Sequence, residues 1–104
     1  MARLKIVWTE TALNQRNNIF EYWNSRNKSN SFSKNLNSKI KDRLVLLHTN
    51  PLLGKATSFK AARVVSLGNY SIIYQAHESQ IIVTALWDNR QDPKKLIEIL
   101  KPKL

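Results

Sequence analysis

The chain has 104 residues, enough for one domain with a single modest core and too few for two. Lys and Arg number 17 against 7 Asp and Glu, and the resulting net charge of +10 suits a nucleic-acid partner, with charge for solubility alone as the alternative. The absence of Cys excludes disulfides and a thiolate nucleophile, and no apolar run approaches the roughly 20 residues of a membrane span. We therefore expect one cytoplasmic globular domain over residues 1–104, without a membrane segment or leader peptide.

The first 49 residues predict a short strand followed by two helices. Leu4–Trp8 alternates imperfectly as a strand, and Thr9 is the expected N-cap of a helix with Glu10 in its first turn. Apolar side chains then recur at spacings of three and four, with Arg16 as the exception. These apolar positions are Ala12, Leu13, Ile19, Phe20 and Trp23. The polar stretch Asn24–Asn30 is predicted to break this helix and form a loop.

The second predicted helix has a clearer apolar face. Its members are Phe32, Leu36, Ile40, Leu44 and Leu47. Ser29 or Ser31 is the expected N-cap, and the helix ends before Pro51. The opposite face is basic, with Lys34, Lys39, Lys41 and Arg43 against the single acid Asp42. Both helices therefore form a hairpin that packs on another layer.

The second half predicts that layer as a sheet of three sequential strands. They are Ala62–Leu67, Tyr70–His77 and Gln80–Trp87, joined by tight turns at Gly68–Asn69 and Glu78–Ser79. After a polar loop, Asp92 and Pro93 are the expected N-cap and first residue of a last helix, 94–100. The predicted fold is α+β: a small antiparallel meander sheet, with the helical hairpin packed on one face and a short C-terminal helix.

Most catalytic and metal-binding motifs find no support in this chain. His48 and His77 have no second ligand at metal spacing, so neither a metal nor another cofactor is expected. Glycine-rich phosphate loops and serine nucleophile elbows do not occur in the sequence. Asp88 and Asp92 are open to two interpretations: a general acid/base pair, or one carboxylate that orients Arg90 and another that caps the last helix.

Basic and aromatic residues on and beside the predicted sheet are the remaining candidates for a binding site. The cations are Lys55, Lys60, Arg63, Arg90, Lys94 and Lys95, and the aromatic residues are Tyr70, Tyr74 and Trp87. Cations pair with phosphates, and exposed aromatic rings stack on unpaired bases. Tyr70 and Tyr74 share one face of their strand, which faces either the core or a ligand, and Trp87 suits the core.

Four motifs in order make the chain resemble the RelE/ParE superfamily of type II toxin–antitoxin toxins over essentially its whole length. They are VWTETALNQRNNIFEYW in the first helix, LHTNPLLGK at the end of the second, the hairpin ARVVSLGNYSIIYQ, and the strand and loop IIVTALWDNRQDPKKL with Arg90. The resemblance implies a small basic toxin that is neutralised by an antitoxin encoded beside it. RelE-like members cut mRNA in the ribosomal A site without a metal, whereas ParE-like members inhibit DNA gyrase and are not nucleases.

The residues favour the ParE, or plasmid-stabilisation, branch. If the chain were a nuclease, the resemblance would assign catalysis to Arg90, Arg63 and Lys55. However, Ser66 and Ser71 stand where RelE-like relatives carry Arg, and Leu96 stands where a catalytic Tyr is expected. The Asp-x-Arg-x-x-Pro loop at residues 88–93 is more similar to the ParE branch, where Arg90 either contacts the target or pairs with an aspartate.

Three functional hypotheses follow. The favoured one is a toxin that blocks growth by binding DNA gyrase; the alternatives are a ribosome-dependent mRNA endoribonuclease and a non-toxic basic nucleic-acid-binding module. All three share a partner, a small, acidic and partly disordered antitoxin, to which the charge of +10 is suited. The groove between the first helices and the sheet is the expected docking place for that partner.

Overall fold

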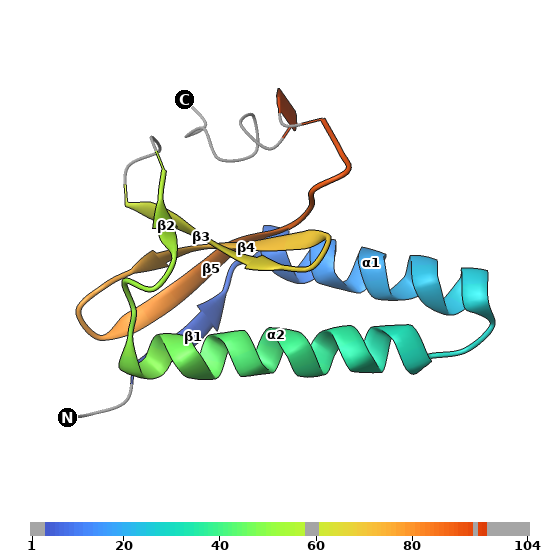
Figure 1. Cartoon of the computed structure of the whole chain (residues 1–104), viewed down its shortest axis with the longest axis horizontal. Helices are drawn as coiled ribbons and strands as arrows, with labels where there is room; N and C mark the ends of the chain where they lie inside the picture. The colour runs from blue at the N-terminus through green and yellow to red at the C-terminus, as the bar shows by residue number, and fades with distance from the viewer. Residues whose placement is uncertain (1–3, 58–60, 93, 96–104) are drawn as a thin grey trace.

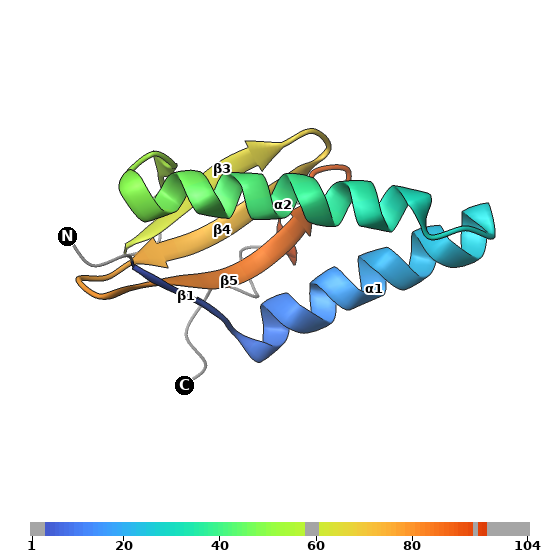
Figure 2. The same ribbon diagram turned by 90° about the horizontal axis from the view of Figure 1, so that it is seen from below.

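The protein folds into one layer of helices on a single sheet. The structure, a computed structural model, describes residues 4–57, 61–92 and 94–95. These residues form β1 (Lys5–Trp8), α1 (Glu10–Asn27), α2 (Ser31–Thr49), β2 (Lys55–Ala56), β3 (Ala62–Leu67), β4 (Tyr70–Ala76) and β5 (Gln80–Asp88). Both helices lie on the same face of the sheet, and the turn that joins them projects beyond the ends of the strands (Figures 1 and 2). The α+β class and the helical hairpin on one face are confirmed.

The sheet contains the predicted antiparallel meander with one further strand at each edge. Its order is β1-β5-β4-β3-β2, in which β3, β4 and β5 pair antiparallel. The first strand pairs parallel to β5, with Lys5 opposite Gln80, so the sheet is mixed rather than wholly antiparallel. A parallel neighbour needs a long crossover connection, and the helical hairpin forms part of it. The two-residue β2 was not predicted, because so short a strand has no alternation to detect.

Helix α1 begins as predicted but continues further than predicted. The Thr9 hydroxyl accepts a hydrogen bond from the Ala12 amide at 3.1 Å, which confirms the N-cap. The predicted break at Asn24 is wrong: the helix runs to Asn27 and ends at Lys28, whose φ of 51° is left-handed. Polar residues carry only a mild helix penalty, so a polar stretch alone does not stop a helix. The extra turn carries Arg26 onto the face that holds Trp23.

Helix α2 has the predicted apolar face and a different start. It begins at Ser31 with Asn30 as N-cap and no side-chain capping bond, so the expected cap at Ser29 or Ser31 is wrong. The buried Ser33 hydroxyl instead donates to the Asn24 side chain at 2.7 Å, which ties the two helices together. The helix ends at Thr49, before Pro51, as predicted.

Two apolar clusters lie on opposite faces of the sheet. The cluster under the helices contains Leu36, Ile40, Leu44 and Leu47 of α2 together with Tyr70, Ile72 and Tyr74 of β4 and Ile81, Val83 and Leu86 of β5. On the other face, Ala62, Ile73, Ala85 and Trp87 form a smaller cluster. The prediction that Trp87 belongs to the core is confirmed, and the shared face of Tyr70 and Tyr74 is the core face.

The predicted connections of the second half are confirmed where the structure describes them. Gly68 takes a φ of +63°, the left-handed conformation that glycine adopts without strain, at the β3–β4 turn. Asp92 accepts a hydrogen bond from the Lys94 amide at 3.0 Å, as an N-cap does, but the predicted helix at 94–100 is described only to Lys95. Neither helix in the described ranges is long and apolar enough to cross a membrane.

Candidate functional site

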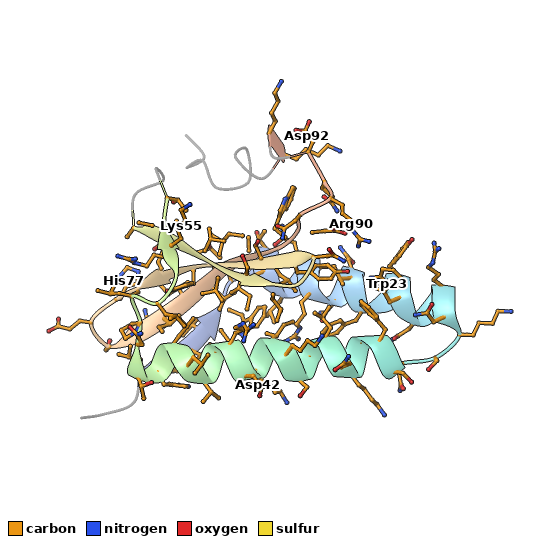
Figure 3. All side chains as sticks on the ribbon, viewed as in Figure 1. Trp23, Asp42, Lys55, His77, Arg90 and Asp92 are labelled. Carbon is orange, nitrogen blue, oxygen red and sulfur yellow. The ribbon has the colours of Figure 1, made fainter. Side chains whose placement is uncertain are left out.

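An open cavity of about 450 Å³ lies between the C-terminal half of α1 and the ends of the central strands. Its lining comprises Asn18, Ile19, Tyr22, Trp23 and Arg26 from α1, Tyr70 from β4, Asp88 from β5, and Arg90 and Gln91 from the loop that follows. We call it the Arg90 pocket. It contains the arginine that the sequence singled out, and Figure 3 shows Arg90 beside Trp23.

Aromatic rings form the floor of the Arg90 pocket. The Trp23 indole N–H donates to the Tyr70 hydroxyl at 2.8 Å, so α1 and β4 hold the two rings in a fixed relation. The Trp23 ring packs edge-on against Tyr22 with centroids 5.1 Å apart. Because Tyr70 is buried and its hydroxyl is engaged, its role is to support the floor, and its ring is not free to stack on an unpaired base.

Two arginines flank these rings. The Arg90 guanidinium lies 5.9 Å from the Trp23 ring centre and 6.0 Å from that of Tyr70, within the range of cation–π attraction. Arg26 lies 5.8 Å from Trp23 on its own helix and donates to the Tyr22 hydroxyl at 3.1 Å. The pocket therefore offers two cations against the single carboxylate of Asp88.

Asp88 fixes the direction of Arg90. Its two carboxylate oxygens accept from Nε and Nη2 of Arg90 at 2.9 and 2.8 Å, and one of them also accepts the Arg90 amide at 2.9 Å. The side-chain hydrogen bonds from Arg90 lower the pKa of Asp88, although burial opposes that shift. The same contacts raise the pKa of Arg90 above its ordinary value. This geometry confirms the interpretation in which one aspartate orients Arg90 and Asp92 caps the following segment.

The other predicted arginine, Arg63, has a structural role at the opposite end of β4. Its Nη1 donates to the Gly54 carbonyl at 2.8 Å and to the Leu52 carbonyl at 3.4 Å. Tyr74, which is fully buried, donates to the Pro51 carbonyl and accepts from the Gly54 amide, both at 2.8 Å. We call residues 51–54 with these two side chains the clamped turn. The interpretation in which Tyr74 is exposed and stacks on an unpaired base is therefore wrong.

Glycine is required at position 54 by the closeness of Tyr74. A Cβ there would stand 2.7 Å from Cε1 and from the hydroxyl oxygen of Tyr74, closer than real contacts allow. Gly54 thus lets the backbone reach the hydroxyl that anchors it. The glycine that the sequence motif LHTNPLLGK contains has this packing role.

The structure separates the three residues that a nuclease mechanism would need together. Lys55 and Arg63 lie in β2 and β3 near Tyr74, whereas Arg90 follows β5 near Tyr70. Tyr70 and Tyr74 are four residues apart, which is about 13 Å along an extended strand. Figure 3 likewise shows Lys55 and Arg90 toward different ends of the molecule.

The remaining residues that the sequence singled out lie at the surface, support a loop or fall outside the described residues. Lys55, Lys94 and Lys95 are exposed, and Lys60 lies outside the described residues. Ser71, which replaces an expected arginine, is buried and donates to Asn89 at 2.7 Å, so it supports the loop that carries Arg90. Within the described ranges, no three His, Asp or Glu side chains gather where they would hold a metal ion.

Sequence reasoning missed Tyr22 and Arg26 as site residues and assigned Trp23 to the apolar face of its helix. Ile19, Tyr22, Trp23 and Arg26 have the spacing i, i+3, i+4, i+7 of one helical face. This spacing can be read in the sequence, but the predicted helix ends at Asn24, so Arg26 falls in the predicted loop. Only the longer helix shows that this face continues.

The described fold is a helical hairpin on a mixed five-stranded sheet, and an ion-paired arginine follows the last long strand. The comparisons with known proteins show the family. A family model described as the ParE toxin of the type II toxin–antitoxin system parDE matches residues 6–93, and the chain belongs to that family. A search of curated proteins gives no match.

Among solved structures, one with the same fold is described as the chromosomal ParDE toxin–antitoxin system from P. aeruginosa, and it superposes with a TM-score of 0.67 at 14% identity. The match covers 81% of this chain and 94% of that chain. At this identity the likeness shows the fold alone, and the ParE branch that the sequence favoured is supported by the family model.

Proposed function

We propose that this protein is a cytoplasmic toxin that arrests growth by binding DNA gyrase through the Arg90 pocket, and that a cognate acidic antitoxin neutralises it. Membership of the ParE toxin family supports the toxin and its antitoxin. The observation that carries the mode of action is the orientation of Arg90 by Asp88 above a floor of Trp23 and Tyr70.

The pocket has the composition of a protein-binding hot spot. Arginine, tryptophan and tyrosine dominate such sites, because they combine a large contact area with directional hydrogen bonds. Asp88 holds the Arg90 head in place before a partner arrives, which lowers the entropy lost on binding. Arg26 adds a second cation on the same wall, so an acidic side chain of the target has two partners.

The geometry gives less support to RNA cleavage. Phosphoryl transfer relies on several cations that are positioned around one transition state. Here Arg63 donates to backbone carbonyls and lies with Lys55 at the end of β4 away from Arg90. A single arginine in the Arg90 pocket suits a contact better than a cleavage centre.

The net charge of +10 supports the antitoxin side of the proposal. An acidic, partly disordered antitoxin is drawn to such a surface by long-range attraction and folds as it binds. The Arg90 pocket lies in the groove between α1 and the sheet, so an antitoxin that occupies it would block the toxin directly.

The test compares gyrase and the ribosome as targets of the purified protein. We expect inhibition of gyrase supercoiling by the wild type, and about a tenfold or greater loss of potency in Arg90→Ala, as for a hot-spot arginine. Lys34→Ala removes the same charge from an exposed site on α2 and serves as the control. Cleavage of mRNA on programmed ribosomes that Arg90→Ala abolishes would contradict the proposal and indicate the nuclease instead. No effect on either target, with salt-dependent binding to any polyanion, would indicate the non-toxic module.

A further inference from the structure

The described residues expose five large hydrophobic side chains, and four of them lie between positions 45 and 53. They are Val45 and Leu46 at the end of α2 and Leu52 and Leu53 in the clamped turn; the fifth is Tyr22. Leu52 is 62% exposed and Leu53 is 46% exposed. Single exposed leucines need no explanation, but Leu52 and Leu53 are adjacent in the clamped turn, and exposed apolar side chains that lie together are typical of an interaction surface.

The two leucines of the turn are held rigidly. The carbonyls of Pro51, Leu52 and Gly54 all accept hydrogen bonds from Tyr74 or Arg63, and the Leu53 amide donates to the Asn50 carbonyl at 3.1 Å. The backbone polar groups are therefore directed into the protein while the leucine side chains face solvent. A rigid display of apolar side chains lowers the entropy that a partner loses on binding.

A shallow hollow of about 180 Å³ lies beside Leu52. Arg63 and four alanines, Ala56, Ala61, Ala62 and Ala76, complete its lining. Because alanine side chains are short, the floor leaves room for one bulky apolar side chain from outside. Leu52 forms one wall, so an inserted side chain would be in contact with it.

The charges around this surface specify the occupant. Lys41 lies one turn before Val45 on α2, Lys55 follows the turn, and Arg63 lines the hollow. The acids Asp42, beside Lys41, and Glu78, two residues after Ala76, stand against these three cations. A second copy of this chain would bring another net charge of +10 to the contact, so self-association is opposed. An acidic segment with a large apolar side chain satisfies both the hollow and the cations.

We infer that the clamped turn and its alanine hollow form a second docking surface, which binds an acidic segment of another protein through a bulky apolar anchor. This surface lies at the opposite end of β4 from the Arg90 pocket and does not depend on gyrase being the target. A failure to inhibit gyrase would therefore leave this inference intact, and the reverse also holds.

The test uses a fluorescent 16-residue peptide rich in Glu with two Leu residues, and a second peptide with Ser in place of both Leu. Binding to the full chain is followed by fluorescence anisotropy. We expect the leucine peptide to bind more tightly, and Leu52→Ser to weaken it about tenfold or more, as for a central apolar contact. Thr11→Ser, which changes an exposed side chain near the start of α1 outside the lining of both sites, is the control and should leave the affinity within about twofold.

Three results would overturn the inference. Equal affinity for the two peptides would show that charge attraction alone binds them and that no apolar anchor is used. Loss of binding in Tyr22→Ser or Arg90→Ala, but not in Leu52→Ser, would place the peptide in the Arg90 pocket. A wild-type dimer that becomes a monomer in Leu52→Ser, measured by sedimentation velocity, would make a second copy the occupant. Because Leu52 is exposed, thermal unfolding should show that Leu52→Ser still folds.

Discussion

The two ends of β4 use the same pair of residue types for different purposes. At one end, Tyr70 lies beneath Arg90, whose head is held by a carboxylate and remains 54% exposed. At the other end, Tyr74 and Arg63 bind backbone groups of one turn, and Tyr74 is completely buried. Arg63 is a structural brace because its guanidinium donates to backbone carbonyls, whereas Arg90, which Asp88 holds, is the group that we propose for binding.

The comparison predicts that the clamped turn tolerates little change. In Gly54→Ala the new Cβ meets the Tyr74 ring and hydroxyl at 2.7 Å, and the ring has no space in which to move. We expect a loss of about 3 kcal/mol in the free energy of unfolding, at the upper end for overpacking. Urea denaturation measures it. A stability equal to the wild type would show that the turn shifts without penalty and that the clamp is loose.

The second prediction compares the loss of unfolding free energy when each tyrosine hydroxyl is removed, and it is smaller than that for Gly54→Ala. Tyr74→Phe leaves the Pro51 carbonyl and the Gly54 amide without their buried partner, for an expected loss of about 2 kcal/mol. Tyr70→Phe removes only the acceptor of the Trp23 indole N–H, for an expected loss of about 1 kcal/mol. Each variant serves as the control of the other in the same denaturation series. The reverse order would contradict the assignment of Tyr74 to the more demanding structural role.

The smallest effect concerns the Asp88–Arg90 pair and its dependence on pH. Because Arg90 lowers the pKa of Asp88 in the folded protein, the pair stabilises the fold above the ordinary aspartate pKa. That contribution is lost as pH falls below about 4, through the lowered pKa. Since Arg90 is half exposed, solvent screens the pair and the change in stability is slight.

An NMR titration of the Asp88 carboxylate measures this directly. We expect its pKa to lie below the usual aspartate range in the wild type and to rise in Arg90→Gln, which keeps a polar side chain but not the charge. The same pKa in both proteins would show that Arg90 is not held by Asp88 in solution.

The fold was largely predictable from local signals in the sequence. The Thr9 cap, the apolar repeat of α2 and the glycine turn at Gly68 each act within a few residues, and each predicted its element. The parallel pairing of β1 with β5 depends on residues 75 positions apart, and no local pattern reports it. The extension of α1 to Asn27 was missed because polar residues weaken a helix only slightly.

The site was predictable only in part, for a related reason. Arg90 was identified because it follows the last predicted strand at the place of the superfamily's arginine, and its pairing with Asp88 is local. Arg63 was also a candidate, because nothing near it in the chain shows that the carbonyls of Leu52 and Gly54 lie within reach. Arg26 was missed because the predicted helix ended before it, whereas Tyr22 lay inside that helix but was not counted on its apolar face.

The most direct test of this account compares Arg90→Ala with Arg63→Ala in growth arrest and in the free energy of unfolding. Both variants lose one positive charge and the same side chain. We expect Arg90→Ala to lose toxicity while its free energy of unfolding stays close to that of the wild type, as for a surface residue. Arg63→Ala should lose about 1–2 kcal/mol of stability and retain its toxicity per folded molecule. A folded Arg63→Ala without toxicity beside a fully toxic Arg90→Ala would reverse the roles of the two ends and contradict the account.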